Sequence, residues 1–426
     1  MKKLYTSLLL AAALTGCTAS SAANVTETEI TPTASEIAVD ETAVTEPADT
    51  ITEDTSSVVT TVYTSNTGIL DTTDLFTERD LTQTADLSEA VYYTVQDGQN
   101  ISITEAGVFV LSGTASEVTV TVDADDEAKV QIVLDGVSIT NTDAPCIYVK
   151  NADKVFVTTT DSDNTLSVTG TFTADEDTNT DAVIFSKDDL VLNGTGTLTI
   201  VSSDNGISCK DELKVTGGTI SITSTSDAIE ANDAILIADG NITIQSSKDG
   251  LHAENDEDNA VGYIYICGGT LNISASDDAI HATTVIQMDD GNVTLNAAEG
   301  IEATYIQING GDIDIHAGDD AINAGRKSNA YTACIEINDG NITIVMGNGD
   351  TDAIDSNGNI YINGGTIDIT ANSPFDYDGT AQYNGGTIIV NGQVTNTITN
   401  QMMGGGMMQG QMPGGNMQGG HNGGWH

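Results

Sequence analysis

The chain has 426 residues, of which 63 are acidic and 12 are Lys or Arg, so its formal net charge is −51 at pH 7. Such a surface repels polyanions, which excludes nucleic acid as a partner and favours a neutral polymer, a cation, or an anion bridged by cations. Aromatic residues are only 4% of the chain, so flat rings for gripping neutral sugars are scarce.

The first residues have the pattern of an exported lipoprotein. Two lysines precede an apolar run that ends in a Leu-Thr-Gly-Cys box at Cys17. Residues 1–16 are therefore predicted to be a signal peptide for the Sec route, and Cys17 to be the lipidated residue that anchors the protein at the cell surface. The alternative is an ordinary secretory peptide with an incidental Cys.

Two segments lack the apolar residues needed for a core. Residues 17–85, rich in Thr, Ser and Glu, are predicted to be a disordered acidic linker because burial could not offset their ordering entropy. Residues 401–426, rich in Gly, Met and Gln, are predicted to be a disordered tail. Residues 86–400 between them are predicted to form one repeat domain.

A five-residue motif recurs through this domain. It reads acid or Asn, small residue, aliphatic residue, polar residue, then Ala, Ser or Cys, and its first residues are separated by 22, 22, 29, 21, 21 and 32 positions. Repetition at a short period predicts stacked units, each too small to bury its own apolar side. The aliphatic residues are expected to form one internal ladder spaced by about 4.8 Å. They are Ile207, Ile229, Leu251, Ile280, Ile301, Ile322 and Ile354. Cys209, in the small-residue position, is predicted to be a buried thiol, and no disulfide pairing is implied.

Each unit continues with two alternating segments around a Gly corner, such as residues 235–237 and 242–244 on either side of Gly240. Alternating β-branched residues predict strands, and Gly with Asn or Asp predicts the corners. Three short strands in every 21–24 residues predict an all-β fold, a single-stranded parallel β-helix.

Stacking the motifs produces two columns of polar side chains, one from the leading acids and one from the polar residues three positions later. Carboxylates at strand spacing repel one another, so several of their pKa values are expected to be raised unless cations are bound. Ca²⁺ accepts six to eight oxygen ligands in flexible geometry, so it is the predicted cofactor. The predicted metal-binding residues are Asp227, Glu230, Asp249, Asp277, Asp278, Glu299, Glu302, Asp319, Asp320, Asp352 and Asp355.

One other interpretation of these acids stays open, and a second metal is less favoured. Each acid could accept a backbone N–H at the corner before its strand, with no metal. Zinc is disfavoured because the histidines are scattered among hard oxygen ligands instead of clustering with Cys.

The two longest repeats indicate where a ligand lies. Their insertions, residues 254–262 and 325–333, follow the same motif position and are predicted to form the two walls of a trough. Its expected floor holds Asp278, His281, Glu299 and Glu302. The predicted carbohydrate-binding residues are His252, His281, Tyr265, Tyr305, Arg326 and Lys327. Such a groove suits an acidic sugar chain, with calcium bridging carboxylates and Arg326 pairing with a uronate. The alternative is that both insertions are solvated loops.

Three sequence segments resemble those of a known family: residues 107–113, 130–139 and 147–155. The Asp-Ala-Ile repeats follow them in the same order as in that family. Over about residues 90–392, the chain resembles a bacterial surface family of calcium-binding, polysaccharide-binding β-helix proteins whose fold is similar to that of polysaccharide lyases. The resemblance implies a right-handed, pectate-lyase-like parallel β-helix, bound calcium, and adhesion to plant-type polysaccharides such as polygalacturonate and cellulose. It does not supply the individual ligand residues.

The sequence therefore predicts a non-catalytic, monomeric, calcium-dependent polysaccharide-binding protein at the cell surface. A calcium-dependent pectate-type lyase is the first alternative, because that chemistry needs calcium and a Lys or Arg base, for which Lys248 and Arg326 are candidates. The second alternative is a metal-binding or scaffolding lipoprotein whose methionine-rich tail, with His421, holds soft copper.

Overall fold

The structure, a computed structural model, describes residues 68–255, 257–348 and 351–401. The chain divides into two units, Met1–Thr60 and Thr61–His426, and all described residues belong to the second. The predicted signal peptide, the lipidation site at Cys17 and most of the predicted linker and tail lie outside the described residues. Among the described residues, no helix has the length and apolar character needed to cross a membrane.

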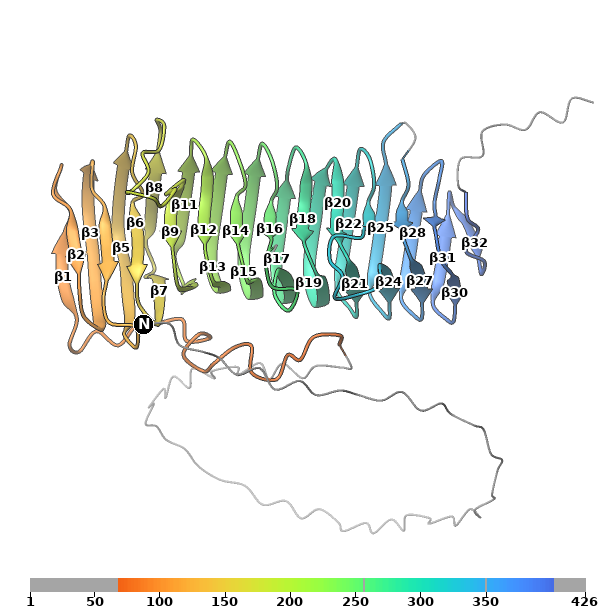
Figure 1. Ribbon diagram of the computed structural model, residues 1–426, viewed down its shortest axis with the longest axis horizontal. Helices are drawn as coiled ribbons and strands as arrows, with labels where there is room; N and C mark the ends of the chain where they lie inside the picture. The colour runs from red at the N-terminus through yellow and green to blue at the C-terminus, as the bar shows by residue number, and fades with distance from the viewer. Residues whose placement is uncertain (1–67, 256, 349–350, 402–426) are drawn as a thin grey trace, which may run out of the picture. The chain divides into compact units, whose positions relative to one another are not determined.

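The described chain is all-β, and its strands form two sheets (Figure 1). Sheet B has 12 strands: β2 (Ile101–Ile103), β4 (Val120–Asp123), β6 (Ile147–Asn151), β9 (Ala182–Ser186), β12 (Asn205–Cys209), β14 (Ile229–Ala231), β16 (Leu251–Ala253), β18 (Asp278–Ala282), β20 (Glu299–Ala303), β23 (Ile322–Ala324), β26 (Ile354–Ser356) and β29 (Asp376–Tyr377). Each strand of sheet B pairs in parallel with the strand of the next repeat, as in the pairing of β14 with β16.

Sheet A has 20 strands and is also parallel, except for the pairing of β31 with β32. Its strands are β1 (Val91–Thr94), β3 (Gly107–Ser116), β5 (Lys129–Asn141), β7 (Lys154–Thr159), β8 (Asp163–Val168), β10 (Asp189–Gly194), β11 (Thr197–Ser202), β13 (Glu212–Ser224), β15 (Ala234–Ser246), β17 (Tyr263–Ser274), β19 (Val285–Ala297), β21 (Tyr305–Ile308), β22 (Asp312–Ala317), β24 (Cys334–Ile337), β25 (Asn341–Met346), β27 (Asn359–Ile362), β28 (Thr366–Thr370), β30 (Ala381–Tyr383), β31 (Thr387–Val390) and β32 (Gln393–Thr395).

Sheet A bends along a line of glycines, so that one repeat, hereafter a coil, has one strand in sheet B and two strand segments in sheet A. The register of β13 on β15 shifts at this bend, between Val215 and Thr219. Gly269 sits at the bend with φ +86°, and a Cβ there would lie 3.0 Å from the carbonyl oxygen of Gly240 in the preceding coil. Only glycine combines this left-handed conformation with so close an approach of two coils.

The core lies inside the coils and is one continuous apolar cluster. The predicted aliphatic ladder is confirmed, because each member pairs in register with the next and all are fully buried. Cys209 is also fully buried, as predicted, and the four described cysteines are free thiols.

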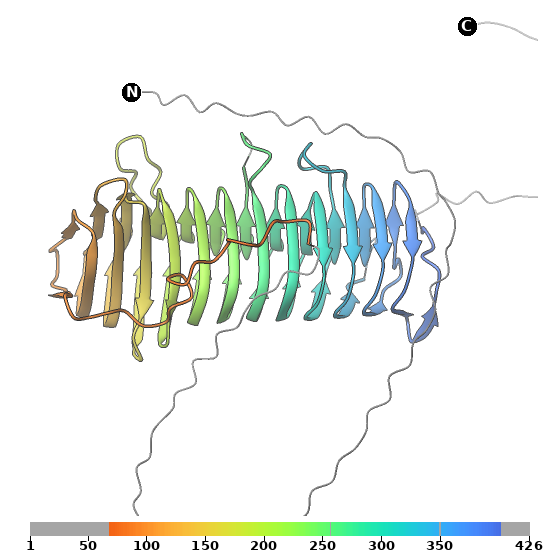
Figure 2. The ribbon, with the colours of Figure 1, turned by 90° about the horizontal axis from the view of Figure 1, so that it is seen from below.

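The sequence placed residues 68–85 in the linker, but the structure packs residues 68–84 against sheet A as an irregular segment with turns, hereafter the N-terminal strap (Figure 2). The backbone N–H groups of Ile69 and Leu70 donate to the side-chain oxygens of Gln307 and Gln287, at 2.8 and 2.9 Å. Apolar strap residues pack on sheet A, and the fully buried Asp80 lies between two lysines of that sheet. The few apolar side chains of the strap suffice because the coil already provides the apolar surface that they cover.

Candidate functional site

The leading acids of the motif form one column beside sheet B, hereafter the leading-acid column. Their carboxylates connect consecutive coils: Asp227 Oδ1 accepts the backbone N–H of Asp249, and Asp249 Oδ1 accepts the backbone N–H of Asp278, both at 3.0 Å. Asn205 on Asp227 and Asp320 on Asp352 repeat this bond at 3.0 Å. One oxygen of these side chains therefore has a structural role that needs no metal, and the second oxygen of each acid remains for other partners.

The polar residues three positions later form a second column on the outer side of sheet B, hereafter the outer column. Strand register places these residues in successive coils: Ser208, Glu230, His252, His281, Glu302, Asn323, Asp355 and Asp376. Asp376 is an addition to the predicted set. It was missed because its coil lacks the Asp-Ala-Ile motif, and its Oδ1 is buried without a hydrogen-bond partner.

Lysines lie among these acids. Lys248 Nζ is 2.9 Å from Asp227 Oδ2 and 3.6 Å from Asp249 Oδ2. Lys210 Nζ is 3.0 Å from Glu230 Oε1. Lys327, predicted to stand on the wall of the trough, instead reaches the acids, with Nζ 2.8 Å from Glu302 Oε1. Each lysine supplies positive charge where the stacked carboxylates would otherwise repel one another.

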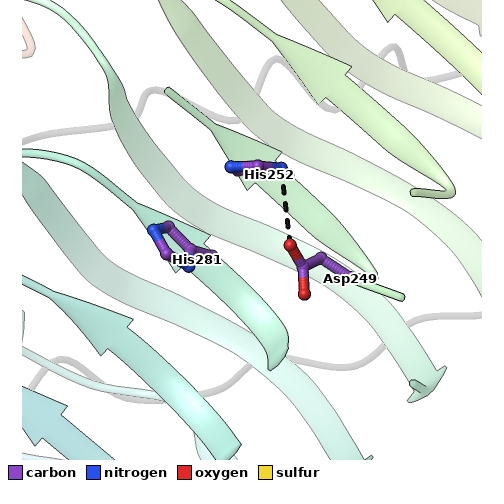
Figure 3. A group of neighbouring side chains, drawn as sticks. All are labelled: Asp249, His252 and His281. Carbon is purple, nitrogen blue, oxygen red and sulfur yellow. Dashed lines mark ion pairs between the residues drawn. The ribbon is translucent and has the colours of Figure 1, made fainter. Parts of the chain in front are cut away.

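The two histidines of the outer column lie on adjacent strands, β16 and β18 (Figure 3). Their ring centroids are 4.9 Å apart with the planes tilted by 55°. Nδ1 of His252 is 3.3 Å from Asp227 Oδ2 and 3.4 Å from Asp249 Oδ2. Nδ1 of His281 is 2.7 Å from Asp278 Oδ2. Both rings therefore direct Nδ1 toward the leading-acid column.

Among residues 68–255, 257–348 and 351–401, three groups of side chains have ligand atoms close enough to share one metal ion, with all atoms of a group within 4.8 Å of one another. The groups are Asp249 with His252 and His281, Asp278 with His281 and Glu302, and Asp249 with Asp277 and Asp278. Several predicted metal-binding residues belong to none of these groups in the described part of the chain, namely Asp227, Glu230, Glu299, Asp319, Asp320, Asp352 and Asp355. The acids therefore converge most closely on β16, β18 and β20.

The pKa values of these acids follow their surroundings. Burial, reinforced by Glu302 and Asp278, raises the pKa of Glu299 to about 7. Burial with the charges of Asp319 and Asp352 raises the pKa of Asp320 to about 6. The prediction that several values are raised is thus confirmed, although burial is a larger cause than repulsion.

The pKa values of two acids in the columns are shifted in opposite directions. Burial alone would raise the pKa of Asp227, but hydrogen bonds from His252 and Lys248 outweigh it and lower the value to about 2. Burial, followed by the charges of Asp320 and Asp376, raises the pKa of Asp355 to about 7. Among the described residues, no lysine forms an ion pair with Asp355, so repulsion among these acids is unrelieved there.

Both predicted insertions leave the same corner and project from the same side of the coils (Figure 2). They do not stand apart as the walls of an open trough, because Ser328 Oγ of the second loop donates to Asn259 Oδ1 of the first at 3.0 Å. The backbone N–H of Ser328 also donates to Thr304 Oγ1 at 2.8 Å. The second loop is thus fixed in place over the corner between the two longer repeats.

A pocket of about 340 Å³ lies on the other side of the second loop, between that loop and the corners of the next coils. Arg326 Nη2 donates to the carbonyl oxygen of Asn357 at 2.7 Å and to Asp378 Oδ2 at 3.1 Å. Tyr331 lines the same pocket and meets Tyr305 edge-on, with ring centroids 6.1 Å apart. The sequence predicted Arg326 but missed Tyr331 and Asp378, which belong to no repeated column.

The predicted tyrosines differ in accessibility. Tyr265 is only 3% exposed because the N-terminal strap covers it, and its hydroxyl donates to Asp289 Oδ2 at 2.8 Å. This corrects the expectation that Tyr265 binds carbohydrate, since no ring face is open for a sugar. Tyr305 is partly exposed, and its hydroxyl donates to Glu336 Oε2 at 2.7 Å.

The match to a protein-family model agrees with a carbohydrate ligand. The model of the family described as "Carbohydrate-binding domain-containing protein" matches residues 97–351 and 299–404. No curated protein matches the chain. The chain is similar to a solved structure titled "Structure of the polysaccharide lyase-like protein from C. thermocellum, Gadolinium derivative", with 31% identity, coverage of 52% of this chain and 92% of that chain, and a TM-score of 0.45. The family model matches more than half of this chain, so the chain belongs to the family of carbohydrate-binding domain-containing proteins.

Proposed function

We propose that this chain is a non-catalytic surface protein that binds acidic polysaccharides of the polygalacturonate type, and also cellulose, with the help of calcium. Membership of a carbohydrate-binding family supports the polysaccharide. The observation that carries the calcium dependence is the group of Asp249, Asp277 and Asp278, whose ligand oxygens lie within 4.8 Å of one another. Ca²⁺ prefers ligand sets made only of oxygen atoms and accepts flexible coordination geometry.

The exposure of these three acids indicates how calcium and glycan meet. Asp249 and Asp278 are buried, whereas Asp277 is exposed at the edge of sheet B. A calcium ion held by the buried pair and by Asp277 keeps open coordination positions on the solvent side. A uronate carboxylate of the glycan fills those positions, so that the ion bridges two sets of negative charges.

The pocket beside the second loop supplies the direct sugar contacts of this proposal. Arg326 and Asp378 place a donor and an acceptor side by side, which suits neighbouring sugar hydroxyls, and the remaining guanidinium N–H groups suit a uronate carboxylate. Tyr331 offers a ring at the same place. The loop is held by hydrogen bonds at Ser328, so little ordering entropy is lost when the sugar binds.

The lyase alternative gains no support from the candidate bases. β-Elimination needs an unprotonated base beside the sugar ring. Burial would lower the pKa of Lys248, but its hydrogen bond to Asp227 and the charges of Asp227 and Asp249 outweigh burial and raise it. The guanidinium of Arg326 has only donor N–H groups and no acceptor atom, so it is not suited to take a proton from the sugar. Both groups therefore act as cations that attract carboxylates.

The decisive experiment measures retention of polygalacturonate by the full-length protein with calcium, with chelator, and with calcium restored. The expected result is retention that is lost with chelator and regained with calcium, without unsaturated-product absorbance. Asp277→Asn is expected to weaken calcium-dependent retention about tenfold, or ~1.4 kcal/mol. Its matched control is Asp290→Asn, an exposed acid at the bend of sheet A. Retention that is unaffected by chelator overturns the calcium dependence, and product absorbance overturns the non-catalytic assignment.

The finer points of fold and location complete the proposal. We infer a right-handed single-stranded β-helix, because connections between parallel strands are right-handed in about 98% of cases. A crystal structure tests the hand of the coil.

Export by the Sec route, a lipid anchor at Cys17 and a monomeric state are also proposed. Metabolic labelling with a fatty-acid analogue, compared between the native chain and Cys17→Ser, tests the anchor. Light scattering of the purified protein tests the monomer.

A further inference from the structure

We propose that His252, His281 and Asp249 form a binding site for a divalent transition-metal ion of the zinc class, whose two histidine ligands distinguish it from the oxygen-only calcium group with which it shares Asp249. The sequence disfavoured zinc because the histidines are scattered among hard oxygen ligands instead of clustering with Cys. In the fold, two of these histidines lie in adjacent coils of the outer column, so both can serve one ion together with a carboxylate.

The geometry fits one small ion. The ligand atoms of the three residues all lie within 4.8 Å of one another (Figure 3). Zinc binds imidazole nitrogen and carboxylate oxygen at about 2.0–2.2 Å, so two ligands of one ion lie at most about 4.4 Å apart. Small rotations of the side chains close this difference without moving the strands.

The ligand set selects the metal. Two imidazoles with one or two carboxylates are typical of zinc, nickel and copper sites, whereas calcium takes oxygen ligands almost exclusively. Asp278 is placed to be a further ligand or to orient His281, because its Oδ2 lies 2.7 Å from His281 Nδ1. Asp249 is fixed by the bond from its Oδ1 to the backbone N–H of Asp278, which leaves Oδ2 for the ion.

The charge of the surroundings also favours a dication. Five carboxylates contact the two rings, from Asp227, Asp249, Glu254, Asp278 and Glu302. The lysines at these acids are Lys248 and Lys327, so negative charges outnumber positive ones. The side chain of Lys248 is 45% exposed, so it can swing into solvent when an ion occupies the site.

Both proposed metal sites use Asp249, so the variants that distinguish the zinc-class site from the calcium site change other residues. His252→Ala and His281→Ala remove ligands of the zinc-class ion only, and Asp277→Asn removes a ligand of the calcium group only. The background chain is His421→Ala with His426→Ala, which prevents these tail histidines from contributing.

The experiment titrates the metal-stripped, full-length background chain with Zn²⁺ by calorimetry and with Co²⁺ by visible absorption, in calcium-free buffer. We expect one Zn²⁺ per chain and a Co²⁺ spectrum of a nitrogen-ligated ion. Each His variant should weaken Zn²⁺ binding at least tenfold while its calcium uptake and melting temperature stay unchanged, and Asp277→Asn should leave Zn²⁺ binding intact. Zn²⁺ binding that is absent, or that is equal in the background chain and both His variants, overturns the site. Neither result affects the calcium-dependent retention of glycan, so the two proposals fail independently.

Discussion

Asp227 Oδ1 accepts the backbone N–H of Asp249 at 3.0 Å, one coil further along the stack. The same bond joins Asp249 to Asp278, so the leading-acid column stabilises the stacking of coils while presenting second oxygens outward. Structural and ligand-binding roles are thus combined in one side chain. An amide serves at Asn205, where Oδ1 accepts the backbone N–H of Asp227 and Nδ2 donates to Glu230 Oε2, both at 3.0 Å.

Substitution of Asp249 should separate these roles. Asp249→Asn keeps an oxygen acceptor for the N–H of Asp278, whereas Asp249→Ala leaves that buried N–H without a partner. Asp249→Ala should therefore lower the free energy of unfolding by about 1–3 kcal/mol relative to Asp249→Asn in metal-free buffer. Urea unfolding measures the difference. Equal stabilities of the two variants would show that the bond contributes nothing.

Asp211 should make stability depend on pH. Burial, with the charge of Asp189 and the neighbouring Asp233, raises the pKa of Asp211 to about 7 from a usual value of 3.8. The folded state therefore binds more protons than the unfolded state between about pH 4 and pH 7, so stability falls as the pH rises through this window.

Asp211→Asn tests this dependence, since it should be more stable than the native chain at pH 8, by roughly 1 kcal/mol after allowance for solvent screening. The gain should vanish near pH 4, where the native carboxyl is protonated in the folded state. Thermal unfolding at both pH values measures it, with Asp135→Asn as an exposed control. A gain of equal size at both pH values contradicts the assignment.

The packing of the N-terminal strap on sheet A should depend on Asp80. Its carboxylate is fully buried, 3.5 Å from Lys154 Nζ and 3.6 Å from Lys214 Nζ. Asp80→Ala leaves two largely buried ammonium groups without this partner and should cost about 3–5 kcal/mol. We expect faster proteolysis within the strap and increased binding of a hydrophobic dye as Tyr265 and Leu236 are uncovered. Glu78→Ala, exposed on the same strap, is the control and should leave both readouts unchanged.

Calcium should stabilise the fold by mass action. An ion at 100 times its dissociation constant adds about 2.7 kcal/mol to the free energy of unfolding, which corresponds to a rise of a few degrees in melting temperature. The rise should shrink in Asp277→Asn and persist in His252→Ala. Scanning calorimetry with and without calcium measures it, and an identical rise in the native chain and Asp277→Asn would exclude Asp277 as a ligand.

Tyr331 should contribute to glycan binding because it lines the pocket. Tyr331→Ala is expected to weaken polysaccharide retention about tenfold, or ~1.4 kcal/mol. Tyr361→Ala is the matched control, since Tyr361 is also partly buried but does not line the pocket. Equal losses in the two variants would indicate damage to the coil instead of a lost sugar contact.

Much of the site was predictable because the period fixes each residue's place in a coil. The ladder from Ile207 to Ile354 and the outer column follow from spacing alone, since parallel strands in register bring equivalent positions together. The resemblance to a known family added an expected ligand class. The pairing of His252 with His281 was implicit in the same register, but its significance for metal choice emerged only when distances were available.

The sequence by itself determined the repeat, the inward apolar positions and the two acid columns, because these are periodic. Only the tertiary structure decided which non-repeating parts meet. It placed the strap over Tyr265, joined Asn259 to Ser328, and set Arg326 beside Asp378. Such contacts form where a loop or a terminal segment packs on an apolar or charged surface of the folded coils. That surface is made by residues far apart in the sequence, so local spacing does not predict it.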